Sequence, residues 1–123
     1  MLRDDLIGEP EVWAMMVARF PWVEVERGDI GDGLIHLEFA ALRSGVEAAA
    51  APKDVKAALP ILSFVENLYS DARLHPDVLN AIDVSFVEDL YLSEEHQRDF
   101  AEGLLGPHTR ARWDEVAGWH TAQ

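Results

Sequence analysis

The chain has 123 residues, 49% of them hydrophobic, which is enough for one domain with a core that needs no metal or disulfide. It contains no cysteine, which excludes disulfides, thiolate catalysis and cysteine-bound zinc and fits a reducing, cytoplasmic location. Its formal net charge is −13, from 23 acidic residues against 10 lysines and arginines, so nucleic acid and anionic membranes are disfavoured as partners.

The N-terminal residues MLRDDLIGEPE lack the apolar core of a signal peptide, and no apolar run approaches the length of a membrane span. We therefore expect residues 1–123 to form a single domain.

Residues 9–20 are predicted to form the first helix. Pro10 stands at its first helical position, where a missing backbone N–H costs nothing, and the flanking Glu9 and Glu11 favour the positive end of the helix dipole. The apolar side chains with helical spacing are Trp13, Met16, Val17 and Phe20. Pro21 ends the helix, because the residue before a proline is disfavoured in helical conformation.

The segment 22–39 has two interpretations. Residues 22–26 (WVEVE) alternate apolar and polar side chains, and residues 34–39 (LIHLEF) can be paired with them as a β-hairpin around the glycine-rich loop 28–33. Alternatively, residues 34–51 form one helix, whose shared face carries Leu34, Leu37, Ala41 and Ala48. The run of alanines at 48–51 and the length favour the helix, although Gly45 weakens its middle.

Residues 55–72 and 76–91 are predicted to form two antiparallel helices joined by a turn at 74–76. The expected buried stripe of the first comprises Val55, Leu59, Leu62, Val65, Leu68, Tyr69 and Ala72, widened by Ile61 and Phe64. Pro60 predicts a kink there, or a helix that ends and restarts. Pro76 opens the second helix, whose expected stripe is Leu79, Ile82, Phe86 and Leu90.

Two further helices are predicted toward the C-terminus. Ser93 is expected to cap the first of them, with Glu94 and Glu95 in its first turn. Gly106 ends that helix and Pro107 opens the last one. Trp113 and Trp119 cannot both lie at the centre of one face of the last helix, so one of them is expected to be partly exposed.

Together these patterns predict an all-α domain of five or six helices. We expect the helices to pack as successive antiparallel hairpins, somewhat like a short HEAT-type array. The small β-hairpin at 22–39 is the alternative for that segment.

The tetrad Ser-Phe-Val-Glu occurs at 63–66 and again at 85–88, which gives Glu66 and Glu88 corresponding positions on two successive helices. Two such carboxylates could converge for acid–base chemistry or metal binding. The competing interpretation is that the phenylalanines and valines are core and both glutamates face water.

Motifs for other chemistry do not occur in the sequence. There is no nucleophile elbow, no phosphate-binding glycine loop and no His-Glu-x-x-His pattern, and no histidine stands three residues after a carboxylate. We therefore predict no catalytic residue, no metal ligand and no cofactor.

The stretch FVENLYSDARLHPDVLNAIDVSFVEDLY, from Phe64 to Tyr91, resembles a family of small acidic all-α bacterial proteins of unassigned function. The likeness is carried by Asn80, Ala81 and the Ser-Phe-Val-Glu run at 85–88. Some of these proteins resemble immunity proteins, so the resemblance implies a helical protein that neutralises a toxin.

The charge pattern points to binding rather than catalysis. We expect an acidic face close to the turn at Ser93, formed by Glu88, Asp89, Glu94, Glu95, Asp99 and Glu102. Such a face attracts a basic protein partner, and the resemblance implies that this partner is a toxin that the chain inhibits. The alternatives are a carboxylate-based metal protein or enzyme centred on Glu66 and Glu88, and a homo-oligomeric scaffold whose partner is a second copy.

Overall fold

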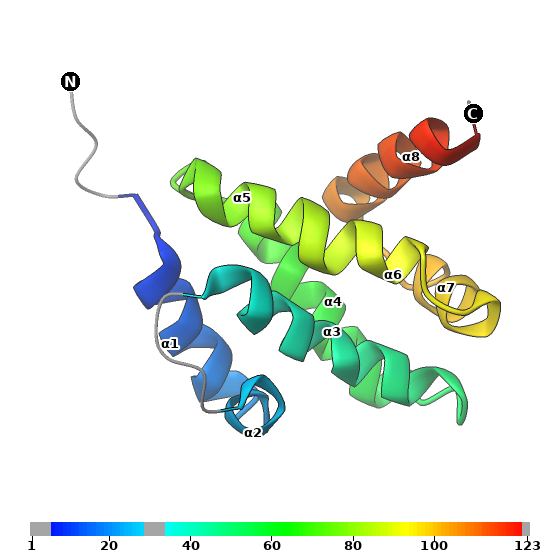
Figure 1. Cartoon of the computed structure of the whole chain (residues 1–123), viewed down its shortest axis with the longest axis horizontal. Coiled ribbons are helices and arrows are strands. Elements are labelled where there is room, and N and C mark those ends of the chain that lie inside the picture. Colours follow the sequence, from blue (N-terminus) through cyan, green and yellow to red (C-terminus); the bar gives the residue numbers. More distant parts are fainter. Residues whose placement is uncertain (1–5, 29–33, 122–123) are drawn as a thin grey trace.

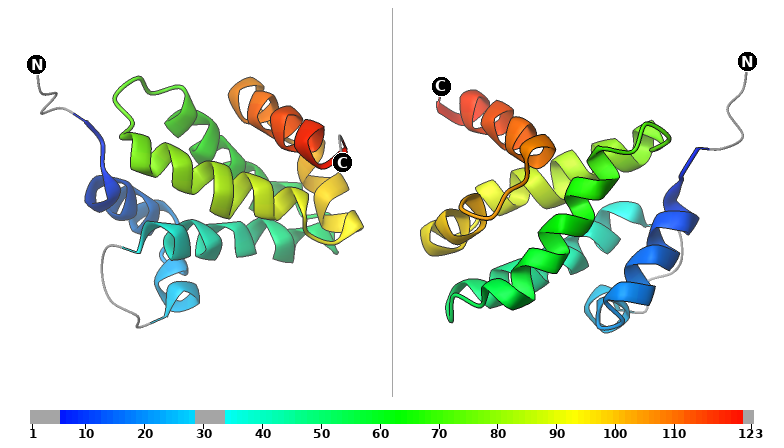
Figure 2. Two further views of the ribbon diagram at one scale, coloured as in Figure 1. Left: turned by 45° about the horizontal axis from the view of Figure 1, so that its top comes forward. Right: turned by 180° about the vertical axis from the view of Figure 1, so that it is seen from behind.

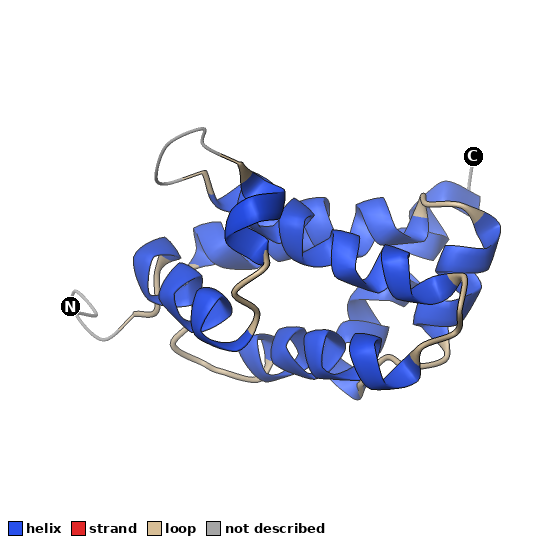
Figure 3. Cartoon of the chain, turned by 90° about the horizontal axis from the view of Figure 1, so that it is seen from below, coloured by secondary structure: helices blue, strands red, loops and turns tan. Residues whose placement is uncertain are grey.

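A computed structural model describes residues 6–28 and 34–121 of the chain. Within these ranges the regular structure is helical, and the sole β-type contact is an isolated bridge between Ile7 and Leu74 (Figures 1 and 3). The all-α prediction is therefore confirmed. None of the described helices is long and apolar enough to cross a membrane.

The order of the elements is α1 (Glu9–Arg19), α2 (Val23–Arg27), α3 (Ile35–Ala50), α4 (Val55–Tyr69), α5 (Pro76–Ile82), the π-helical segment η1 (Asp83–Glu88), α6 (Asp89–Tyr91), α7 (Glu95–Glu102) and α8 (Pro107–Thr121). All the helices predicted from the sequence are present. Segments α5, η1 and α6 form one continuous rod, and Figure 1 shows α3 beside this rod with α4 crossing behind both.

The β-hairpin alternative for 22–39 is wrong, because its two arms lie in α2 and α3. Val23 is fully buried and Val25 is 82% exposed, although strict alternation would place both on one face. Residues two apart on a helix point about 200° away from each other, which explains the difference. The loop residues 29–33 lie outside the described part of the chain.

Helix α3 is the central element of the fold. It packs against α1, α2, α4, α5, η1 and α7. Of the face predicted for it only Ala41 is buried, whereas Leu34, Leu37 and Ala48 are exposed. The buried face carries Phe39, Leu42, Val46, Ala49 and Ala50 instead. The predicted face left out Phe39, whose ring removes far more apolar area from water than an alanine side chain does.

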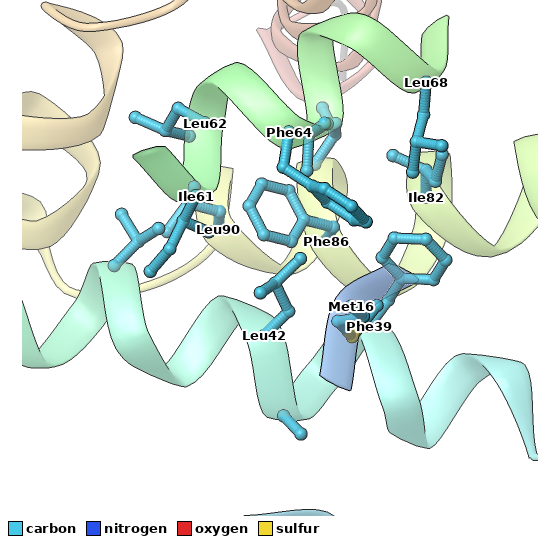
Figure 4. Close-up of a cluster of buried hydrophobic side chains, with 14 of the residues drawn as sticks. Met16, Phe39, Leu42, Ile61, Leu62, Phe64, Leu68, Ile82, Phe86 and Leu90 are labelled. Atoms are coloured by element: carbon cyan, nitrogen blue, oxygen red, sulfur yellow. The ribbon is translucent and has the colours of Figure 1, made fainter. Parts of the chain in front are cut away.

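The core forms where α3, α4 and the α5–η1–α6 rod meet. Figure 4 shows Leu42 and Phe39 of α3 directed toward Phe64 of α4 and toward Phe86 and Ile82 of the rod. All five side chains are buried, and Met16 of α1 joins the same cluster. These contacts link segments far apart in the sequence, so the chain forms one core.

Helix α4 runs through Pro60 without ending and restarting. The backbone N–H that proline lacks would have served the carbonyl of Lys56, one turn earlier. Lys56 is exposed, so water can satisfy that carbonyl. Val55 and Leu59 are exposed, contrary to prediction, and Ala58 between them is buried; Ala72 lies beyond the end of the helix.

The second Ser-Phe-Val-Glu tetrad lies in the π-helical segment, whereas the first lies in regular helix. A π-helical turn contains more residues than an α-helical turn, so side chains after it are rotated relative to the sequence pattern. Ser85 is consequently buried, and its hydroxyl lies 2.7 Å from the His36 Nδ1 of α3, whereas Ser63 is exposed. The two tetrads therefore have different environments.

The carboxylate of Glu66 joins α4 to the start of α8. It accepts hydrogen bonds from the backbone N–H groups of His108 (3.0 Å) and Thr109 (2.9 Å) and from the Thr109 hydroxyl (2.9 Å), and it lies 2.6 Å from the His108 Nδ1. Burial alone would raise the pKa of Glu66, but these hydrogen bonds lower it to about 2. Glu66 thus caps another helix and neutralises the positive end of its dipole.

Gly106 makes this contact sterically feasible. A Cβ at this position would lie 2.6 Å from Cδ and 2.7 Å from Oε1 of Glu66. The Gly106-Pro107 pair, predicted as a stop and a start, therefore also provides room for a carboxylate from α4.

Replacing Glu66 by alanine is expected to lower the free energy of unfolding by roughly 2 kcal/mol, because amide groups at the start of α8 lose their acceptor. Gly106→Ala should have a similar effect, because its methyl group displaces the carboxylate. The double variant should lose less than the sum of the two, since a truncated residue 66 leaves the space that the methyl group needs. Urea unfolding of the four proteins measures the coupling.

Gly103→Ala is the matched control. A Cβ there meets nothing nearer than 3.8 Å, so the substitution should be neutral or slightly stabilising. Strict additivity of Glu66→Ala and Gly106→Ala would contradict the shared-space explanation.

Candidate functional site

The six acidic residues predicted to form one face lie on η1, α6 and α7, at one end of the molecule. Glu88 ends η1 and Asp89 opens α6. Glu94 precedes α7, and that helix carries Glu95, Asp99 and Glu102. The structure therefore brings the six into one region, but their side chains have different surroundings.

Three of the six side chains contact other helices. Asp89 accepts a hydrogen bond from Nη1 of Arg43 on α3 at 2.9 Å. Glu102 accepts one from Nε1 of Trp113 on α8 at 3.0 Å, and Glu88 lies 3.9 Å from the imidazole of His120. These carboxylates hold α3 and α8 against the α6–α7 region.

The other three, Glu94, Glu95 and Asp99, project into solvent, and we call them the α7 acidic surface. The side chains of Glu94 and Asp99 are 77% and 67% exposed. Their nearest basic groups belong to the same short stretch of chain: His96 lies 3.4 Å from Glu94, and Arg98 lies 3.9 Å from Asp99. No lysine or arginine of another described helix forms an ion pair with these three carboxylates.

The cap of α7 is Glu94, one residue later than predicted. The Glu94 N–H donates to the side-chain carbonyl of Gln97 at 3.2 Å, and Glu94 accepts in return from the Gln97 backbone, which forms a capping box. The Ser93 hydroxyl donates back to the carbonyl of Leu90 at 2.5 Å, so it is not free to cap α7. Glu94 therefore combines a structural role with its surface charge.

Apolar side chains are exposed at the same end of the molecule. Trp119 is 58% exposed and Trp113 is 1% exposed, which confirms that one of this pair lies at the surface. His120, next to Trp119, stacks on Tyr91 with ring centroids 5.7 Å apart, so the end of α8 lies against α6. Leu92, which follows α6, is 54% exposed. Exposed tryptophan surrounded by polar groups is a common anchor in protein interfaces.

Glu66 and Glu88 do not meet. Glu66 binds the first residues of α8 and Glu88 lies near His120 at its end, and these positions are about 18 Å apart along a helix. Within residues 6–28 and 34–121, no cluster of three or more histidine, aspartate or glutamate side chains has an arrangement that could hold a metal ion. The paired-carboxylate site considered from the sequence is therefore not assembled by this fold.

A second carboxylate, which the sequence analysis missed, lies in the interior. Glu38 of α3 is fully buried and accepts a hydrogen bond from the Arg27 Nη1 of α2 at 3.0 Å. The Arg27 guanidinium in turn lies 4.4 Å from the ring centroid of Trp13 on α1. The signal in the sequence is the position of Glu38 on the same face as Ile35 and Leu42, where an acid is unusual.

Burial raises the pKa of Glu38 to about 7, and the nearby carboxylate of Glu9 adds to the shift, while Arg27 opposes it. A carboxyl group with a raised pKa binds its proton more tightly in the folded state than in the unfolded chain. Glu38 therefore makes the fold less stable as the pH rises from about 4.5 to about 7.

We expect Glu38→Gln to remove much of this pH dependence, because the amide is neutral throughout and can still accept from Arg27. Urea unfolding at several pH values between 4.5 and 7 measures the slope. Glu24→Gln, at an exposed position of α2, is the control and should keep the slope of the parent protein. Parallel profiles for Glu38→Gln and the parent would contradict this role.

Comparison with known proteins identifies a family for most of the chain. Residues 14–120 match the family described as "Domain of unknown function (DUF7674)". No match was found among curated proteins, and none among solved structures. The match includes the stretch 64–91 on which the resemblance to a family of unassigned function rests, but it gives no link to immunity proteins. Because the matched region covers well over half of the sequence, the chain belongs to the DUF7674 family.

Proposed function

We propose that this chain is a protein-binding module that recognises a basic partner through the α7 acidic surface. The observation that carries the proposal is that some acidic side chains have basic partners on other helices and others do not. Asp89 and Glu38 are bound by arginines of other helices, whereas Glu94, Glu95 and Asp99 have no such partner within the described residues. These three carboxylates are therefore available to a positively charged group of another molecule.

Electrostatics and apolar anchoring support the same proposal. The net charge of −13 attracts a basic protein over a distance and accelerates its association. Exposed Trp119 and Leu92 at the same end of the molecule offer apolar contacts that long-range attraction alone does not provide. Surface charges would thus steer the partner, and the apolar groups would slow its release.

In its specific form, the proposal is that the partner is a basic toxin and that the chain inhibits it in the cytoplasm, as an immunity protein does. This part is supported by the resemblance over residues 64–91 and by the acidic composition.

A symmetric dimer through the same surface is disfavoured on physical grounds. In a two-fold interface each patch meets its own copy, so Glu95 and Asp99 would face like charges. Desolvating like charges is costly, and this surface fits a basic partner better than a second copy.

The double charge reversal Glu95→Lys/Asp99→Lys is expected to abolish capture of the partner. Affinity purification from the native cell followed by mass spectrometry would identify basic proteins retained by the parent chain. Binding of a retained protein, measured with both components purified, should weaken at least tenfold from about 0.1 M to about 1 M salt, where the Debye length falls from ~10 to ~3 Å.

The matched control is Glu11→Lys/Glu24→Lys, which makes the same change in net charge on α1 and α2. Glu11 lies in the first turn of its helix, as Glu95 does, and both control positions are exposed. Figures 1 and 2 show α1 and α7 at opposite ends of the molecule. Equal loss of binding in both double variants would indicate a response to net charge alone, and salt-independent binding would refute the acidic-surface mechanism.

A further inference from the structure

A hollow of about 300 Å³ lies between α1 and α4, at the end of the molecule far from α7. Its walls are mainly apolar and include Ile7, Met15, Phe64 and Leu68. The volume is at the lower end of the range for small-molecule sites and equals that of about ten water molecules. The space therefore suits a small ligand.

The rim of the hollow carries a net positive charge, although the chain as a whole is strongly acidic. The charged lining residues are Arg19, Arg73 and Asp71, which sum to +1. The Asp71 carboxylate accepts three hydrogen bonds from Arg73, from the backbone N (2.9 Å), Nε (3.1 Å) and Nη2 (3.0 Å). These bonds hold the pKa of Asp71 below its usual range, so this carboxylate is charged and already paired with Arg73.

Arg19 is not engaged in the same way. Its guanidinium lies 5.7 Å from the ring centroid of Phe64, and no carboxylate of the described residues forms an ion pair with it. The side-chain amide of Asn67 also lines the hollow and has no hydrogen-bond partner among these residues. A cation and an amide thus stand beside an apolar wall, with donors free for an incoming group.

We propose that this hollow binds a small monocarboxylate with a short apolar chain. The carboxylate pairs with Arg19 and accepts from the Asn67 amide, and the apolar part packs on Met15, Phe64 and Leu68. The net charge of the lining matches a single negative charge. A cation would be repelled by Arg19, and a neutral apolar molecule would cover the guanidinium without giving it a partner. The site is separate from the α7 acidic surface and stands independently of the proposed function.

Octanoate is the probe, with octanamide as its neutral counterpart of the same length. Isothermal titration of the whole chain should show saturable binding of octanoate and at least roughly tenfold weaker binding of octanamide, because the neutral amide forms no ion pair with Arg19. Backbone amide shifts in NMR spectra should move at Ala18, Arg19 and Leu68.

Two substitutions test the location and the charge separately. Ala18→Trp places a large side chain at an exposed lining position and should abolish binding of both probes without disturbing the core. Arg19→Gln should weaken octanoate roughly tenfold and remove its advantage over octanamide. Lys56→Gln, which removes one positive charge at the far end of α4, should bind as the parent does.

Absence of saturable octanoate binding would overturn the proposal. Equal affinity for octanoate and octanamide would also overturn it, since no carboxylate would then be recognised. Unchanged binding in Ala18→Trp would place the ligand elsewhere and exclude this hollow.

Discussion

The hydrogen bonds between the carboxylate of Glu66 and the first turn of α8 determine how the C-terminal third of the chain packs. They satisfy amide groups at the start of α8 that have no partner within the helix, and they hold its first turn against α4. From that position Trp113 is buried and donates to Glu102 of α7, and His120 stacks on Tyr91. Helix α8 thus connects α4 to η1 and α6, whereas α7, which carries the α7 acidic surface, packs on α3 and α6.

The helix boundaries could be predicted from the sequence because local signals mark them. Proline at positions 10, 76 and 107 opens helices, and each of these helices begins within one residue of its proline. The buried faces were harder to predict. The buried face of α3 is centred on the bulky Phe39 and Leu42 rather than on the predicted alanines, and the π-helical segment η1 changes the helical period. Period-two alternation over residues 22–26 was misleading because the segment is too short to distinguish a strand from a single helical turn.

For the candidate sites, too, the sequence predicts what depends on neighbouring residues and misses what depends on contacts between distant segments. The acidic residues near Ser93 are adjacent in sequence, so their proximity was predictable, but their separation into structural and free carboxylates depends on partners such as Arg43 and Trp113. Glu66 was singled out because of a repeated tetrad, yet its partner is the start of α8. The hollow beside Arg19 combines α1, α4 and the following turn, and no local motif predicts such a site.

The central claim is that the chain binds a basic protein at the end formed by α6, α7 and the last turns of α8. Hydrogen–deuterium exchange of the chain, alone and bound to its captured partner, tests this claim most directly. We expect new protection over residues 88–102 and 113–121 and little change in α1 and α2. Protection confined to α1, α2 and the start of α3, with α7 unchanged, would contradict it.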